Sequence, residues 1–132
     1  MTRFDATTEP TRIELVADAI AAHRERGSAA TTLTVEPTDA DREIGHGAPW
    51  IQYFEGTVAL DCTDYELEQL KKLLDDFPSF SIDELVTPEE AEGTHARVTA
   101  RTDDERIGQF VDRVFREVFD RSEGYRLWVA EI

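Results

Sequence analysis

The stretch that decides the fold is Thr94–Ile132, THARVTARTDDERIGQFVDRVFREVFDRSEGYRLWVAEI, which predicts a strand, a long amphipathic helix and a second strand. Residues 94–101 alternate small apolar side chains with polar and cationic ones, as in a strand with one buried face. Thr102 and Glu105 form a T-x-x-E capping box, which predicts a helix start. Apolar residues then recur at helical spacing, and Gly124 indicates the turn before the last strand. A crossover of this length makes the two strands parallel to each other.

A second unit with the same pattern lies 39 residues earlier in the chain. A strand within residues 50–61 precedes another T-x-x-E box, Thr63 and Glu66, then a helix and a strand at 80–86. The joined order resembles the ferredoxin-like topology, in which two helices cover one face of an antiparallel four-stranded sheet. We therefore predict an α+β fold with a ferredoxin-like βαββαβ sandwich over about residues 50–131. Many unrelated functions use this topology, so the resemblance implies no activity.

The N-terminal part predicts an addition to this core within a single domain of residues 1–132. Residues 1–9 are expected to form a disordered tail, and residues 10–36 a helix followed by a strand. We expect this strand to pair antiparallel with the strand at 50–60, which extends the sheet to five strands. The added helix either joins the other two helices or covers the opposite face of the sheet.

Three local features of the N-terminal half add detail to the predicted fold. Thr11 and Glu14 form a third T-x-x-E box, which predicts the start of the added helix. Glu55-Gly56 indicates a β-bulge within a long strand, with a hairpin turn as the alternative. Residues 37–49 form the longest irregular segment, and long loops are either functional or mobile.

The composition points to a cellular environment. The formal net charge is −15, and two lysines stand against twelve arginines. This balance is typical of the acidic proteome of halophiles, where molar salt screens charge repulsion within a few ångströms. The alternative is attraction of a basic partner. We expect a cytoplasmic protein, because the first residues do not resemble a signal peptide, no apolar run is long enough for a membrane span, and Cys62 has no second cysteine to pair with.

The sheet face that points away from the helices is the candidate functional surface. If Ala96, Val98 and Ala100 face the helices, the side chains between them point outward, and Arg126 and Trp128 should do the same on a neighbouring C-terminal strand. The candidates for ligand or partner binding are therefore His95, Arg97, Arg101, Arg126 and Trp128. Residues 94–132 carry 7 basic and 8 acidic side chains, against 7 and 21 in residues 1–93, which sets this part of the chain apart.

Several functions remain open for this surface. The arginines can simply pair with nearby acids on a solvated face. Alternatively, the face forms a homodimer, or it binds an anionic small molecule through its arginines. Single-stranded nucleic acid, with Trp128 stacking on a base, is less favoured because the charge of the whole chain repels it.

Signals for catalysis are weak, and we predict no catalytic residue, no cofactor and no metal. His23, His46 and His95 lack the spacing of a zinc site, although His46 between two glycines could act as an acid or a ligand. Cys62 precedes a helix start, where helix N–H groups can lower the pKa of a thiol. The rival hypothesis is thus a small enzyme with its site between the 37–49 loop and Cys62. We expect a non-catalytic module that acts by self-association or by binding an anionic ligand.

Overall fold

The computed structural model describes residues 4–27, 30–39, 48–87 and 93–131. These residues form one sheet and three α-helices, the last of which continues into a π-helical turn. The elements in chain order are β1 (Asp5–Ala6), α1 (Glu9–Arg26), β2 (Thr31–Val35), β3 (Trp50–Phe54), β4 (Thr57–Cys62), α3 (Asp64–Leu74), β5 (Phe80–Val86), β6 (Thr94–Ala100), α4 (Asp104–Arg113), η1 (Val114–Val118) and β7 (Leu127–Glu131).

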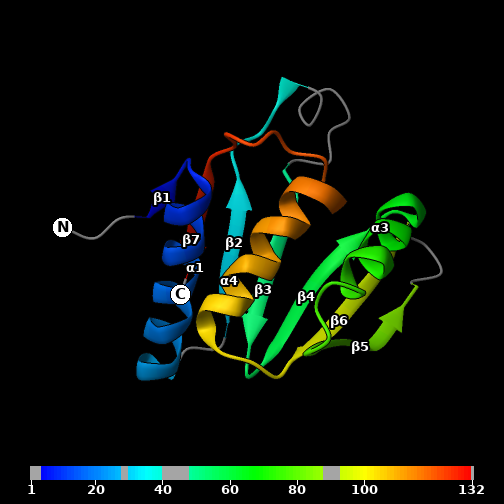
Figure 1. Cartoon of the computed structure of the whole chain (residues 1–132), viewed down its shortest axis with the longest axis horizontal. Coiled ribbons are helices and arrows are strands. Elements are labelled where there is room, and N and C mark those ends of the chain that lie inside the picture. Colours follow the sequence, from blue (N-terminus) through cyan, green and yellow to red (C-terminus); the bar gives the residue numbers. More distant parts are fainter. Residues whose placement is uncertain (1–3, 28–29, 40–47, 88–92, 132) are drawn as a thin grey trace.

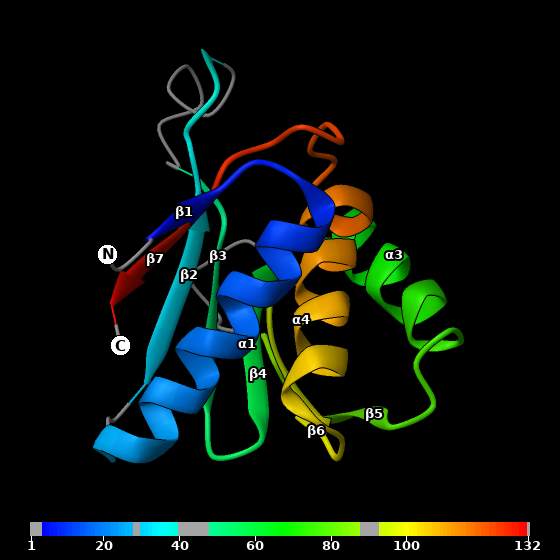
Figure 2. The same ribbon diagram turned by 60° about the vertical axis from the view of Figure 1, so that its left-hand side comes forward.

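The molecule has two layers, a sheet and a row of helices. The seven strands are ordered β1-β7-β2-β3-β4-β6-β5, and each pairs antiparallel with its neighbours. Helices α1, α4 and α3 lie side by side on one face of the sheet, as Figure 1 and the turned view in Figure 2 show. The predicted α+β class is confirmed, and the N-terminal helix joins the other two. No helix of the described residues covers the opposite face.

The strand order differs from the predicted ferredoxin-like sheet. In that topology β7 would lie directly beside β4, but β2 and β3 are inserted between them. Strand β2 pairs with β7 on one side and with β3 on the other, the latter as predicted. The four-stranded order is therefore not confirmed, and β6 and β7 are not neighbours. Strands β2 and β3 therefore lie in the middle of the sheet, whereas β1 extends it at the edge beside β7.

The segment predicted as one long bulged strand is a hairpin. Glu55 and Gly56 have φ angles of 45° and 78°, and two successive residues with positive φ form the tight turn that matches the twist of a β-hairpin. Strands β3 and β4 pair on either side of it, with Phe54 opposite Thr57. The bulge prediction was wrong and its alternative is correct. The turn is fixed to the sheet, because the carbonyl of Gly56 accepts from the N–H of Ala100 at 2.8 Å.

Two of the three predicted helix starts are displaced by a few residues. The box at Thr63 and Glu66 is confirmed, because each residue's side chain accepts from the other's backbone N–H, at 3.2 and 2.8 Å. Helix α4 is instead capped by Asp103, whose carboxylate accepts from the Arg106 N–H at 2.8 Å. An aspartate caps a helix at least as well as the threonine before it, so the pattern alone did not decide between them.

Helix α1 begins earlier than predicted because the first residues are ordered. Thr8 is its N-cap residue and its N–H donates to the hydroxyl of Thr11 at 3.3 Å, so the predicted box of Thr11 and Glu14 is wrong. Asp5 and Ala6 pair with Trp128 and Leu127 of β7. The predicted disordered tail is therefore wrong for residues 4–9, the part of the tail that the structure describes.

The core lies between the two layers. The helix-facing side chains of the sheet alternate with outward ones, and the main ones are Leu33, Val35, Ile51, Tyr53, Val58, Leu60, Ala96, Val98, Leu127 and Val129, all buried. Helices α1 and α4 approach closely at Gly108, where an added Cβ atom would lie 2.7 Å from the carbonyl oxygen of Ile13. Glycine at this position thus allows the two helices to pack backbone against backbone.

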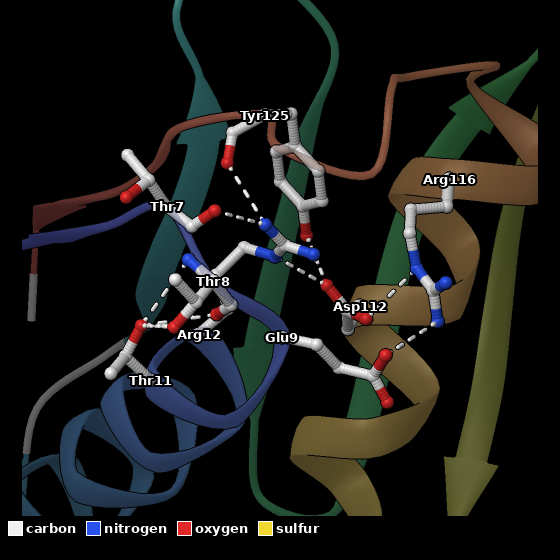
Figure 3. A network of polar contacts seen from close by, with 8 residues as sticks. All are labelled: Thr7, Thr8, Glu9, Thr11, Arg12, Asp112, Arg116 and Tyr125. Atoms are coloured by element: carbon white, nitrogen blue, oxygen red, sulfur yellow. Dashed lines mark hydrogen bonds and ion pairs between the residues drawn. The ribbon is translucent and has the colours of Figure 1, made fainter.

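One charged cluster is buried within this apolar layer (Figure 3). The guanidinium of Arg12, fully buried on α1, donates to the Asp112 carboxylate at 2.7 Å and to the carbonyls of Thr7 and Tyr125 at 2.9 and 3.1 Å. The hydroxyl of Tyr125 donates to the same Asp112 oxygen at 2.9 Å, and Arg116 lies 3.0 Å from its other oxygen. This cluster ties α1, α4 and the segment before β7 together.

Candidate functional site

The sheet face that no described helix covers has an uncharged middle. The outward side chains of β2, β3 and the first part of β4 carry no formal charge, and we call this set the uncharged strip: Thr32, Thr34, Trp50, Gln52, Phe54, Thr57 and Ala59. All of them are partly exposed except Ala59, which is buried. Cross-strand pairing places them in continuous rows, because Gln52 lies opposite both Thr32 and Ala59. On a chain with a net charge of −15, an uncharged area of this width is unusual.

Charged residues flank the strip on the β6 side, and His95 and Arg97 each lie beside a carboxylate. The Nδ1 atom of His95 lies 2.8 Å from the Asp61 carboxylate, and Arg97 lies 3.6 Å from that of Glu84. The Arg97 guanidinium also lies 5.9 Å from the centre of the Phe54 ring. As predicted, these two side chains alternate with buried ones and point away from the helices.

The flank on the β7 side has a similar composition. Arg126 lies 2.6 Å from the Asp5 carboxylate and 3.4 Å from that of Glu36, and its guanidinium is 5.7 Å from the centre of the Trp128 ring. Trp128 is 37% exposed, one of the large apolar side chains that remain accessible to solvent. This aromatic ring extends the strip toward the edge of the sheet, because Trp128 is paired with Thr34.

The five predicted binding residues do not form one patch. Strands β4, β3 and β2 separate β6 from β7, so His95 and Arg97 lie about 19 Å from Arg126 and Trp128 at the usual strand spacing. Arg101 follows the end of β6, is exposed, and its N–H donates to the carbonyl of Ser79 at 3.1 Å. The predicted cationic patch is thus two flanks of paired charges with the uncharged strip between them.

The predicted site residues include none from the uncharged strip. The signal for it is the alternation in Trp50–Phe54, WIQYF, in which Ile51 and Tyr53 are buried and the residues between them face outward. Two aromatic residues at i and i+4 of a strand lie on the same face. The place of Trp50 and Phe54 on this face depends on the strand order, because the insertion of β2 and β3 between β7 and β4 brings them to the centre of the sheet.

Cys62 does not have the environment of a reactive thiol. Its side chain is 2% exposed and points into the core from the end of β4. Burial, together with the nearby charges of Glu66 and Asp61, raises the pKa of the thiol from 9.0 to about 12. The thiolate is the nucleophilic form, so this environment opposes the role that the rival enzyme hypothesis gives to Cys62.

The remaining candidates for chemistry are scattered. His23 is buried on α1, with its ring centre 5.6 Å from that of Tyr53, and His95 lies on the outer sheet face. His46 and most of the 37–49 loop lie outside the described residues. Within the described ranges no group of three His, Cys, Asp or Glu residues is arranged to hold a metal ion. None of the helices in those ranges is long and apolar enough to cross a membrane.

Fold and surface together define a two-layer α+β protein in which the described helices all lie on one face of an antiparallel sheet. The whole chain, residues 1–132, matches a family described as "Family of unknown function (DUF7975)", and the chain belongs to this family. No curated protein and no solved structure matches it.

Proposed function

We propose that the protein is a non-catalytic module that associates with a second copy of itself through the uncharged strip. The observation that carries this proposal is the position of the strip, at the centre of a sheet face that no described helix covers. The rings of Trp50 and Phe54 within the strip are partly exposed, and the ring of Trp128 beside it is exposed, so association would remove apolar surface from water. Burial of such a surface is the usual driving force of association.

Charge supports a second copy as the partner. Two chains of net charge −15 repel each other, and the repulsion is smallest where neither surface carries a charge. The flanks contain both signs, since Arg97 pairs with Glu84 and Arg126 with Asp5 and Glu36. Molar salt would reduce the remaining repulsion, because the screening length falls to about 3 Å at 1 M.

The available area fits a modest dimer. Strands spaced about 4.8 Å apart with about 3.3 Å per residue give the whole seven-stranded face roughly 500 Å² per copy, and the three strands of the uncharged strip supply about half of it. Two copies that bury the strip together with its flanks would cover about 1,000 Å², which is near the lower limit for a specific interface. We therefore expect a dimer that depends on protein concentration and salt, with no obligate assembly.

The alternatives have less support. A simple anionic ligand would compete with Asp61, Glu84 and Asp5 for His95, Arg97 and Arg126, because each of these cations already lies beside a carboxylate. Nucleic acid would meet the same acids and the repulsion of the whole chain. The enzyme hypothesis loses its nucleophile with the raised pKa of Cys62.

Sedimentation equilibrium of the Gln52→Glu variant tests the proposal. Gln52 lies in the middle of the strip, so a carboxylate there would face like charge and lose its hydration in the dimer. We expect the wild-type chain to dimerise more tightly at about 1 M than at about 0.1 M salt. In the variant, we expect the dissociation constant of the dimer to rise by about tenfold or more.

The matched control is Gln69→Glu, the same chemical change on α3, in the helix layer. Both glutamines are partly exposed, so the two variants differ mainly in the layer that they alter. A monomer at every concentration and salt would refute the proposal. Equal weakening by both substitutions would assign the effect to net charge and would also refute the role of the strip.

A further inference from the structure

The segment between η1 and β7 passes beside the end of β2 at one end of the sheet (Figure 1). An open cleft of about 510 Å³ is lined by residues of these two segments. Its apolar lining includes Val35, Phe119 and Tyr125, all of which are buried residues. This volume is within the range of small-molecule sites, which are commonly apolar with a few polar groups at the rim. The uncharged strip does not include these three residues, although Glu36 and Arg126 at the rim also belong to the flank on the β7 side.

The walls of the cleft are held in place by unusual backbone geometry. The π-helical turn η1 ends with the N–H of Phe119 donating to the carbonyl of Val114 at 3.0 Å, and the Arg121 N–H donates to Phe115 at the same distance. Between them Asp120 has a φ of 54°, an uncommon conformation for a residue other than glycine. π-Helical turns interrupt α-helices frequently at functional sites. Here the turn positions Phe119 in the lining of the cleft.

The buried Arg12 cluster fixes another part of the lining (Figure 3). The Arg12 guanidinium lies 4.0 Å from the centre of the Tyr125 ring, and the Tyr125 hydroxyl donates to Asp112. Burial and the negative charge of Asp112 raise the pKa of Tyr125, so its hydroxyl remains a neutral donor. The ring is therefore held before any ligand arrives, which reduces the entropy cost of binding.

The rim of the cleft carries charges of both signs in equal number. Glu36 and Asp120 are acidic, and Arg121 and Arg126 are basic. A ligand with a single charge would meet two like charges as well as two opposite ones, whereas a ligand with both charges can place each beside its opposite. We propose that the cleft binds a small amphipathic zwitterion, a molecule with an apolar body, one carboxylate and one ammonium group.

Arg126 and Glu36 are the residues placed to hold the two charges. Arg126 uses Nη1 for Asp5 and has Nε 3.4 Å from Glu36, while an arginine offers five N–H donors in all. Its other nitrogen can thus donate to a ligand carboxylate. The Glu36 side chain is 61% exposed and only loosely paired, so its carboxylate can accept from an ammonium group. The apolar body would lie on Tyr125 and Phe119.

The test uses three probes that share one phenyl body and differ in charge. L-phenylalanine carries both charges, 3-phenylpropanoate only the carboxylate, and 2-phenylethylamine only the ammonium group. Each is titrated into the full ¹⁵N-labelled chain, and the amide shifts of Glu36, Ser122 and Arg126 are followed. We expect saturable shifts, with L-phenylalanine bound about tenfold more tightly than either other probe, as expected for one additional charge-assisted hydrogen bond.

Two variants and one control locate the site. Arg126→Gln should weaken binding of L-phenylalanine and 3-phenylpropanoate about tenfold, and should not weaken binding of 2-phenylethylamine, whose partner Glu36 remains. Arg97→Gln is the matched control, because Arg97 also pairs with a glutamate and lies near an aromatic ring, yet it does not line the cleft. Ser122→Trp fills the cleft without changing a charge and should abolish binding of all three probes.

Three outcomes would overturn the proposal. The first is the absence of saturable shifts with all three phenyl probes up to their solubility limits. The second is equal affinity for the three phenyl probes, which would indicate an apolar surface without charge recognition. The third is unchanged binding in Ser122→Trp, or an equal loss in Arg126→Gln and Arg97→Gln.

Discussion

The two faces of the single sheet differ in what surrounds them. Toward the helices, Leu33, Ile51 and Val98 are buried, and the one charged cluster there is internally paired around Arg12 and Asp112. Away from the helices, partly exposed uncharged polar and aromatic side chains lie in the middle and paired charges lie at the flanks. Folding explains the first face, since its apolar burial and polar pairing stabilise the chain. The second face is not needed for the core, which is why we assign it to association.

The largest loss of stability is expected from a substitution on the helix-facing side, at Arg12. Arg12→Ala would leave the carboxylate of Asp112 buried with less compensation and remove the cation beside the Tyr125 ring. We expect the free energy of unfolding to fall by about 3–5 kcal/mol, as for other buried ion pairs that lose one partner. Urea denaturation measures this. The control Arg24→Ala removes an arginine of the same helix that pairs with Asp104 at the surface, and its midpoint should hardly change.

Cys62 tests the burial of the helix-facing side, because its thiol should react slowly in the folded chain and rapidly in the unfolded chain. With a pKa of about 12 instead of 9.0, its thiolate fraction at pH 8 is lower by about a thousandfold than in the unfolded chain. Alkylation by iodoacetamide, followed by mass spectrometry, should therefore be slow in buffer and fast in urea. Rapid alkylation of the folded chain would restore the enzyme hypothesis.

The same raised pKa of Cys62 makes stability depend on pH. Between about pH 9 and pH 12 the unfolded chain loses the thiol proton while the folded chain keeps it, so unfolding becomes more favourable as pH rises. Below pH 9 the thiol is protonated in both states and contributes no slope. The variant Cys62→Ala should lack this component, and identical pH profiles for the two chains would contradict it.

Gly108 tests how closely the helix layer is packed. A methyl group at this position would lie 2.7 Å from the Ile13 carbonyl oxygen, so Gly108→Ala should push α1 away from α4. We expect a loss of about 1–3 kcal/mol in the free energy of unfolding, the usual cost of overpacking. Gly124→Ala is the control, because nothing lies within 4 Å of its added Cβ atom. A neutral Gly108→Ala would mean that the two helices separate at little cost.

The smallest effect is expected for the outer face. Measured at a concentration where the chain is monomeric, Gln52→Glu should change the free energy of unfolding by less than about 0.5 kcal/mol, because Gln52 packs against no helix. Its effect on dimerisation should be larger than its effect on folding. A large loss of monomer stability would show that the strip serves the fold itself, and would blur the distinction between the two faces.

The local structure could be predicted further than the arrangement of the strands. The alternation around Val98 and the box at Thr63 and Glu66 correctly predict β6, α3 and the direction in which Arg97 points. The predicted position of β7 was wrong, because periodicity shows which face of a strand is buried and does not show which strand lies beside it. That order depends on long-range contacts, here the pairing of β2 with both β7 and β3.

The buried Arg12 cluster had a signal in the sequence, but an arginine is usually taken as a surface residue and was not counted in the apolar stripe. Arg12 and His23 belong to the same helical stripe as Leu15, Val16, Ala19 and Ile20, all of them buried. A charged residue at a core position of this pattern indicates a buried partner, although the sequence does not reveal that the partner is Asp112, 100 residues away. The π-helical turn η1 and the cleft beside it had no comparable signal.

The pairing of β1 with β7 has a mechanical consequence. The two strands are antiparallel, with Asp5 opposite Trp128 and Ala6 opposite Leu127, so residue 4 and residue 129 lie at the same end of the pair. Tension applied to the two ends of the chain would load the hydrogen bonds of this pair one after another, because they lie perpendicular to the strands. The pair would therefore open like a zipper at low force, and stretching would first release the N-terminal strand from the sheet.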